Sequence, residues 1–201
     1  MLAVVGVLGG ALVGCAGDAR SSPPPTVTRD PATTEAAAKR GAGAELAGTV
    51  FADIRFGFNF RYPPEWREGE FAYDPDQTAG VQPAASAAIG FDEDNSVFLT
   101  RYDLAQPVGS AELPDQLNEL NGVITRFAGE TSSGTMTEIG GLPAVTFEEF
   151  ALQDDPDDRR SRVVFLFDGK VEYEVNCQST PDGRDEMSRG CDQILSTLGR
   201  K

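Results

Sequence analysis

The sequence predicts an α+β domain in which a mainly antiparallel sheet is covered by two helices, an α-β-α sandwich. Three observations predict this fold. Apolar residues alternate with a period of two in several segments after residue 49. Two other segments show the three-and-four spacing of an amphipathic helix. The segments occur in the order strands, helix, strands, helix, and short turns between neighbouring strands favour antiparallel pairing.

The first half of the domain begins with strand signals. Phenylalanine occupies every second position from Phe56 to Phe60, and Tyr62-Pro63-Pro64 ends the pattern, because proline cannot donate to a sheet. Two further strand segments, 84–91 and 96–102, are separated by Asp92-Glu93-Asp94-Asn95. We expect these two segments to pair antiparallel, with the acidic loop as their hairpin connection.

A helix is expected next, at residues 113–127, where leucine, isoleucine and phenylalanine recur at helical spacing. Ser110 is its expected N-cap and Gly129 its expected stop. The apolar stripe of this helix predicts that it lies on the sheet.

The second half of the domain returns to strands and ends in a helix. Asp168-Gly169 predicts a two-residue hairpin, because both residues tolerate positive φ. The last helix is expected at 181–198, with Thr180 as its cap and Pro181 in its first turn. The expected strands are 134–139, 144–152, 163–167 and 171–177.

Charge and composition exclude several functions. Residues 49–201 contain 28 acidic and 13 basic residues and therefore carry the whole net charge of −15. Such a domain repels polyphosphate, so nucleic acid is excluded as a partner. It also repels anionic lipid, so membrane attachment requires hydrophobic insertion. The chain has no histidine, which excludes hydrolase triads built on that residue, and we expect no cofactor.

The N-terminal part resembles a bacterial lipoprotein signal. Residues 1–14 are uncharged and apolar, suit the apolar region of a signal peptide and are too short to span a bilayer. Leu12-Val13-Gly14-Cys15 resembles a lipobox, in which Cys15 is acylated and becomes the mature N-terminus. The alternative is a chance cysteine after an ordinary leader, and the segment lacks the usual Lys or Arg residues. Residues 15–48 predict a disordered tether, and residues 49–201 the domain.

The other two cysteines, Cys177 and Cys191, fall at the end of the last strand and on the inward face of the last helix. Export to an oxidising compartment favours a disulfide between them, and the chain-entropy model assigns such a loop about 3 kcal/mol. Two free buried thiols are the alternative.

Acidic clusters do not predict a metal site. Asp154-Asp155-Pro156-Asp157-Asp158 lacks the ligand spacing of a calcium loop, so we expect a solvated hairpin loop and no metal. Arg159, Arg160 and Arg162 are expected to balance its charge.

Three stretches resemble PsbP/Mog-like α/β domains and actinobacterial Lpq-type lipoproteins of the same fold. Gly57-Phe58-Asn59-Phe60-Arg61-Tyr62-Pro63-Pro64-Glu65-Trp66 resembles the family's opening, and Ile139-Gly140-Gly141-Leu142-Pro143-Ala144 its central turn. Asn176-Cys177 and the residues from Cys191 to Leu198 resemble its ending. The resemblance implies an α-β-α sandwich used for binding or assembly, and it supplies no catalytic residues.

Tyr62 and Trp66 within the opening motif have two possible roles. Large aromatic residues at a strand end more often form a core corner than a ligand contact. Exposure of either ring would make it a candidate ligand contact.

We therefore expect a lipid-anchored extracytoplasmic binding module for a cell-envelope protein, lipid or glycolipid. A structural accessory subunit of an envelope assembly is the alternative, and an enzyme with a carboxylate-based site is least favoured. An apolar patch or deep cavity would favour the first, and a polar surface with a hydrophobic edge the second. Adjacent acids with strongly raised pKa values would favour the third.

Overall fold

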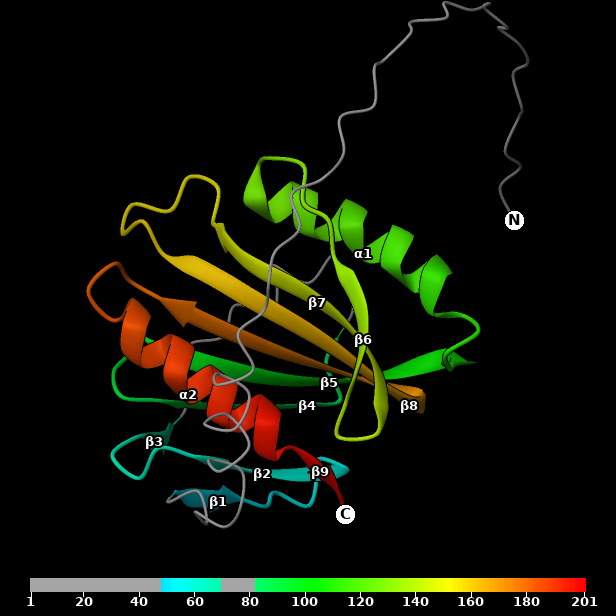
Figure 1. Cartoon of the computed structure of the whole chain (residues 1–201), viewed down its shortest axis with the longest axis horizontal. Coiled ribbons are helices and arrows are strands. Elements are labelled where there is room, and N and C mark those ends of the chain that lie inside the picture. Colours follow the sequence, from blue (N-terminus) through cyan, green and yellow to red (C-terminus); the bar gives the residue numbers. More distant parts are fainter. Residues whose placement is uncertain (1–47, 70–81) are drawn as a thin grey trace, which may run out of the picture. The chain divides into compact units, whose positions relative to one another are not determined.

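The computed structural model describes residues 48–69 and 82–201 (Figure 1). They belong to one compact unit, Ala44–Lys201. The expected leader, Cys15 and the tether lie outside the described residues. No helix in the described ranges is long and apolar enough to cross a membrane.

A large antiparallel sheet forms the centre of the domain, with the order β3-β4-β5-β8-β7-β6. It confirms the predicted α+β class. The hairpin of β4 and β5 forms across the acidic loop as expected. Its strands are β3 (Arg67–Gly69), β4 (Ala85–Gly90), β5 (Ser96–Val108), β6 (Thr135–Ile139), β7 (Leu142–Ala151) and β8 (Arg160–Ser179).

Strand β8 (Arg160–Ser179) folds back on itself and supplies both arms of a hairpin. Its first half pairs with β7 and its second half with β5. The Ser161 hydroxyl donates to Asn176 Oδ1 at 3.0 Å, so the two arms lie side by side. The turn lies at the predicted position, and Gly169 has a φ of +62°. Asp168 does not adopt a positive φ, so that part of the prediction is wrong.

Two helices cover the large sheet, α1 (Leu113–Ala128) and α2 (Arg184–Thr197). The predicted caps Ser110 and Thr180 are wrong, because each lies in a turn before its helix. The N-caps are Glu112 and Gly183, and neither makes a side-chain cap hydrogen bond. Thr180 instead contacts the acidic hairpin loop, where its hydroxyl lies 3.1 Å from an asparagine oxygen. The predicted stop of α1 at residue 129 is confirmed by a left-handed glycine.

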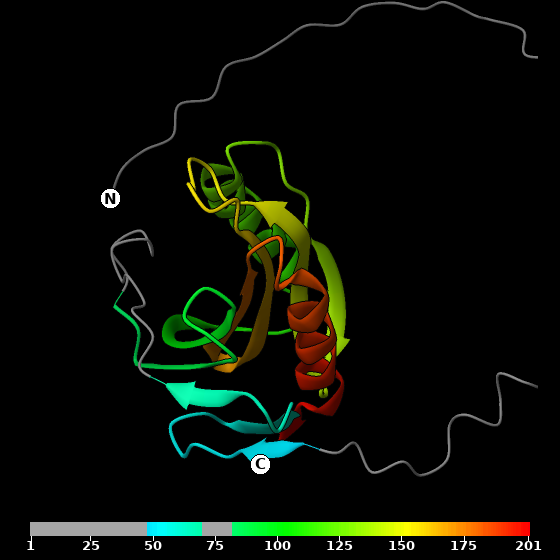
Figure 2. The same cartoon turned by 90° about the vertical axis from the view of Figure 1, so that its left-hand side faces the viewer.

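The helices lie on opposite faces of the sheet and create two cores (Figure 2). Val163, Phe165 and Phe167 on β8 point to the α1 side, where they pack with β7 and α1. Val164 and Leu166, which alternate with them, point to the α2 side. The period of two in the sequence therefore places one arm of β8 between two apolar layers.

A separate small sheet lies below the α2 core and has the order β1-β2-β9. Its strands are β1 (Thr49–Phe51), β2 (Phe58–Tyr62) and β9 (Gly199–Arg200). Inward-facing phenylalanines close the core here, and the rings of Phe51 and Phe60 stack at 4.7 Å. The opening motif thus supplies β2 of the small sheet.

A disulfide bond joins Cys177 on β8 to Cys191 on α2, as predicted. Next to it, Gly190 allows α2 to approach the ring of Trp66. A Cβ at this position would lie 2.1 Å from the ring. The disulfide and the glycine together hold α2 close to the sheet.

Candidate functional site

The α1-facing side of the second arm of β8 carries polar residues, and the neighbouring positions on β5 include Phe98 as well as Thr100 and Tyr102. Glu172 lies opposite Tyr102, and Glu174 lies opposite Thr100, in the antiparallel register. Because side chains two apart on a strand share a face, both carboxyl groups point to the same side. We call this set, together with Asn176, the acidic face.

The structure places the acidic face beside α1 but not under its centre. Helix α1 packs mainly on β7 and β6, whereas the acidic face belongs to the neighbouring β5 and β8. Glu119 on α1 lies near enough to raise the pKa of Glu172. The acidic face is therefore bordered by the helix on one side.

Both carboxyl groups have strongly raised pKa values. Burial is the main cause for Glu172, whose pKa rises from 4.5 to about 7, and the charges of Glu174 and Glu119 add to it. Burial also raises the pKa of Glu174 from 4.5 to about 7, although hydrogen bonds from Asn176 and Tyr102 act in the opposite direction. Both shifts favour the protonated form of the carboxyl group.

The groups around the two glutamates form a hydrogen-bonding array. The Tyr102 hydroxyl donates to Glu174 Oε2 at 3.5 Å, and its ring is 7 % exposed. The Ser161 hydroxyl holds the side-chain amide of Asn176. Carboxyl, amide and hydroxyl groups on one face can both donate and accept hydrogen bonds.

This pair is a finding that sequence reasoning missed. Val171-Glu172-Tyr173-Glu174-Val175 was expected to be a strand, and its glutamates match the pattern of a solvated face. The sequence offered neither glutamate as a candidate site residue. The available signal was an acid pair that alternates with apolar residues on a strand, so that both acids fall on one face of the sheet.

Tyr62 and Trp66 lie in the core. Their rings are 4 % and 3 % exposed. The Tyr62 hydroxyl lies 3.1 Å from Glu68, and burial, with this contact, raises the pKa of Tyr62 to about 12. Trp66 Nε1 donates to Glu186 Oε1 at 3.4 Å. Neither ring has the exposure required of a ligand contact, so both residues serve as core residues in this structure.

The acidic loops are held by local hydrogen bonds. In the β4–β5 loop, Asp92 accepts from the backbone and side-chain amides of Asn95 at 2.8 and 2.9 Å. In the β7–β8 loop, Arg159 pairs with Asp155 at 2.9 Å. No group of three or more potential metal ligands occurs in the described part of the chain.

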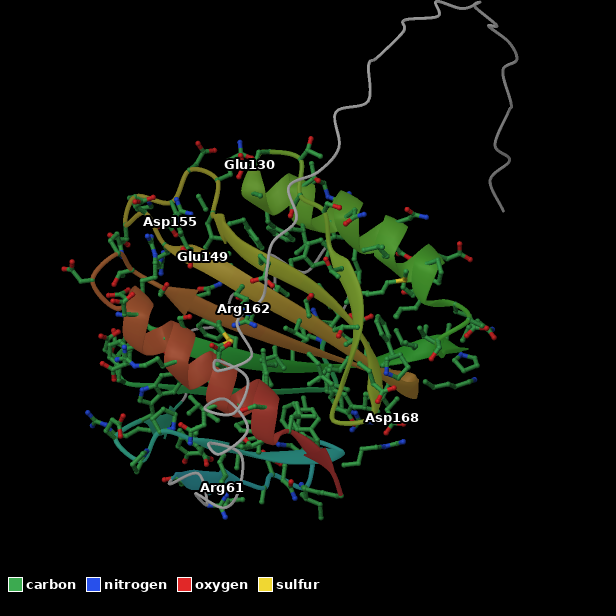
Figure 3. The ribbon with its side chains drawn as sticks, in the orientation of Figure 1. Arg61, Glu130, Glu149, Asp155, Arg162 and Asp168 are labelled. Atoms are coloured by element: carbon green, nitrogen blue, oxygen red, sulfur yellow. A yellow bond between two sulfur atoms is a disulfide. The ribbon has the colours of Figure 1, made fainter. Side chains whose placement is uncertain are left out.

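Only one of the three arginines beside the β7–β8 loop balances its charge. Arg160 instead lies 3.6 Å from Glu149, and Arg162 pairs with Asp192 on α2 at 2.5 Å. Figure 3 shows Arg162 and Glu149 over the face that carries α2. The expectation that all three serve the loop is corrected, since two of them connect β8 to β7 and α2.

An open hollow of about 370 Å³ lies at the hairpin end of β8. Its charged groups include Asp168 and Arg200, which pair with each other, and its walls are largely glycine, proline and apolar residues. Its lining includes Pro107, Val108, Glu112, Leu142, Pro143 and Phe167.

Comparison of sequences gives no relative: no family model matches the chain, and no curated protein matches it. Solved structures do match. A protein from Bacteroides thetaiotaomicron has a TM-score of 0.53 and 14 % identity over 77 % of this chain, but the chain spans only 48 % of that protein. The cyanobacterial PsbP protein CyanoP from Synechocystis has a TM-score of 0.52 and 13 % identity, over 79 % of this chain and 96 % of its own.

A third structure, LpqN of Mycobacterium tuberculosis, described as involved in cell envelope biogenesis, has a TM-score of 0.46 and 12 % identity, over 78 % of this chain and 86 % of its own. The likeness to CyanoP shows that the domain has a PsbP-like fold, as the sequence resemblance implied. Membership of the actinobacterial Lpq-type lipoproteins stays a prediction.

Proposed function

We propose that this chain is an extracytoplasmic lipoprotein, held to a membrane through an acylated Cys15, and that its domain is a non-catalytic binding module. We further propose that the acidic face binds the hydroxyl-rich headgroup of a cell-envelope glycan or glycolipid. The lipobox-like sequence supports export and attachment to a membrane. The disulfide between Cys177 and Cys191 supports export too, because such bonds persist in oxidising compartments.

The observation that carries the proposal is the pair of half-buried carboxyl groups at Glu172 and Glu174, with pKa values near 7. A pair that served stability alone would be matched by a cation, because unpaired buried acids destabilise a fold. The causes of both pKa shifts include acids and neutral groups but no cation. Destabilising groups that persist in a fold are candidates for ligand binding.

The chemistry of the face matches a sugar better than an anion or a long apolar chain. Sugar hydroxyls donate and accept hydrogen bonds, and so do carboxyl groups with raised pKa values and the Asn176 amide. An anionic ligand would be repelled by Glu172 and Glu174. An acyl chain would leave their polar groups without partners.

The proposal of binding without catalysis is supported by the direction of the two pKa shifts, which is the same for both groups. Carboxylate-based hydrolysis of a glycosidic bond uses one protonated and one ionised group, whose environments push their pKa values apart. Burial instead raises the pKa of Glu172 and that of Glu174 to the same region. The acid pair nevertheless strengthens the enzyme alternative beyond what the sequence supported, so the test includes turnover.

The test uses arrays of mannose-, arabinose- and N-acetylglucosamine-based glycans. Three proteins are compared: the parent, Glu172→Gln/Glu174→Gln, and a control with two exposed acids replaced, Glu93→Gln/Glu130→Gln. We expect the parent and the control to bind at least one glycan class and the first variant to lose at least tenfold in affinity. Equal binding by all three, or binding by none, would contradict a glycan site on the acidic face. Cleavage of a bound glycan would contradict the non-catalytic assignment.

A second candidate function is an accessory subunit that joins an assembly through β6. This strand is an edge of the large sheet, and four of its five residues are exposed on both faces. Met136 on β6 is 47 % exposed. An exposed edge with an apolar side chain can accept a strand from a partner. Met136→Lys should then remove a crosslinked envelope partner, and Val50→Lys on the small sheet should not.

A further inference from the structure

The small sheet reverses the charge of the domain. Residues 48–62 and 199–201 contain four basic residues, Arg55, Arg61, Arg200 and Lys201, and one acid, Asp53. Four positive charges and one negative charge give +3. Asp168 of the large sheet pairs with Arg200, and counting it leaves +2. This is a local exception in a domain with a net charge of −15.

The same sheet exposes two of the three large apolar side chains that are most exposed in the described residues. Ile54, in the loop between β1 and β2, is 95 % exposed, and Val50 on β1 is 49 % exposed. Val50 lies opposite Arg61 in the strand register, so both belong to the outer side of the sheet. We call this surface the basic end; its residues are Val50, Ile54, Arg55, Arg61, Arg200 and Lys201.

The loop that carries Ile54 is tied down by hydrogen bonds on both of its sides. Lys201 Nζ donates to the carbonyl oxygen of Asp53 at 2.6 Å and to that of Phe56 at 3.2 Å. Arg101 donates to the carbonyl oxygen of Arg55 at 3.3 Å. The isoleucine is therefore presented to solvent by a braced loop.

The basic end is also where the N-terminal part of the chain joins the domain. β1 is the first described strand, and the 33 residues 16–48 separate it from Cys15 in the sequence. Figure 3 places Arg61 at the opposite end of the domain from Glu130 and Asp155. The chain that leads back to Cys15 therefore enters the domain at the basic end, away from Glu130 and Asp155.

We infer that the basic end rests on an anionic lipid surface, with the Ile54 side chain among the headgroups, where lipid phosphates compete with Asp53 for Arg55 and with Asp168 for Arg200. The inference rests on the membrane attachment proposed above. A single exposed apolar residue is common on protein surfaces. Here the exposed Ile54 coincides with a reversal of the local charge and with the point where the chain enters the domain. Basic residues beside an apolar tip are the composition that favours anionic bilayers, and tethering raises the effective concentration of that surface.

The experiment couples the full chain to lipid nanodiscs through Cys15, the cysteine outside the disulfide, using a maleimide lipid. Attachment then does not depend on acylation in a cell. Nanodiscs contain phosphatidylcholine with or without one-third phosphatidylglycerol, and a nitroxide on the headgroups broadens nearby methyl signals in nuclear magnetic resonance. Ile54 is compared with Met136, an exposed methyl on β6, and with Ile124 in the α1 core.

We expect the Ile54 methyl signal to lose more than half its intensity in anionic nanodiscs, while the two reference methyls keep theirs. Arg55→Gln/Arg200→Gln should restore at least half of the lost intensity, and Arg126→Gln/Arg189→Gln, which removes exposed charges from the helices, should not. Equal broadening of Ile54 and the exposed reference methyl, broadening that ignores lipid charge, or no broadening would overturn the inference. Because the coupling is chemical, this failure is distinct from finding that Cys15 is not acylated.

Discussion

The free energy of unfolding of the parent should fall between pH 5 and pH 8 because Glu172 and Glu174 lose their protons. Replacing both residues by glutamine should remove most of this fall. Each pKa is 4.5 in its ordinary state and about 7 in the folded domain. The folded state keeps its protons to higher pH than the unfolded chain. Stability therefore falls as the pH rises from about 4.5 through about 7, and the penalty is complete above about pH 8.

The size of the effect follows from these two values. At about 1.4 kcal/mol per pKa unit, the penalty for each group grows by roughly 2–3 kcal/mol between pH 5 and pH 8. Both side chains keep part of their surface in water, which screens the charges, so we reduce the sum. The free energy of unfolding should fall by on the order of 3 kcal/mol for the pair.

Urea unfolding at several pH values between 5 and 8 measures this change, with fluorescence of the single tryptophan, Trp66, as the probe. Glu172→Gln/Glu174→Gln should be more stable than the parent at pH 8 and nearly equal to it at pH 5. Other acids also titrate, so the control is Glu93→Gln/Glu130→Gln, which should follow the parent. Parallel curves for the parent and the first variant would refute the assignment of raised pKa values to this face.

Three further predictions concern packing, the disulfide and the anchor. Gly190→Ala should destabilise the domain by about 1–3 kcal/mol through overpacking. Gly122→Ala, where nothing lies within 4 Å of the new Cβ, should stabilise it by about 0.5–1 kcal/mol. Unfolding temperatures that shift in the same direction for both variants would contradict the packing at Gly190. Replacing Cys177 and Cys191 by serine should lower the free energy of unfolding by about 3 kcal/mol, and an unchanged urea midpoint would argue against a native bond. Cys15→Ser should abolish the acyl mass in intact mass spectrometry and release the protein from membranes, and a variant that stays attached would disprove anchoring through this thiol.

Local signals predicted most of the fold. The β4–β5 hairpin, the turn at Gly169 and the left-handed end of α1 at Gly129 all depend on residues within a few positions of one another. The caps at Ser110 and Thr180 failed although their residue types favour capping. In each case a short turn intervenes before the helix. The turn before α2 is held by contacts of Thr180 with the distant Asn95, whereas the turn before α1 is closed locally, where the Glu112 carboxylate accepts from the backbone N–H of Gly109.

The candidate sites were harder to predict because they are assembled across the sheet. Glu172 becomes half-buried only because β5 pairs beside it and α1 borders it, and neither fact is present in the local pattern. The basic end combines Arg55 and Arg61 with Arg200 and Lys201, which are more than a hundred residues away along the chain. The net charge of −15 for the whole chain does not indicate such a cluster.

The pairing of β2 with β9 has a consequence for how the domain is made. Asn59 lies opposite Gly199, so the small sheet is complete only after residues near 200 have been synthesised. Contacts between segments so distant in sequence form late and slow the folding of a domain. Strand β2 should therefore lack one of its two partner strands until the residues of β9 have been synthesised.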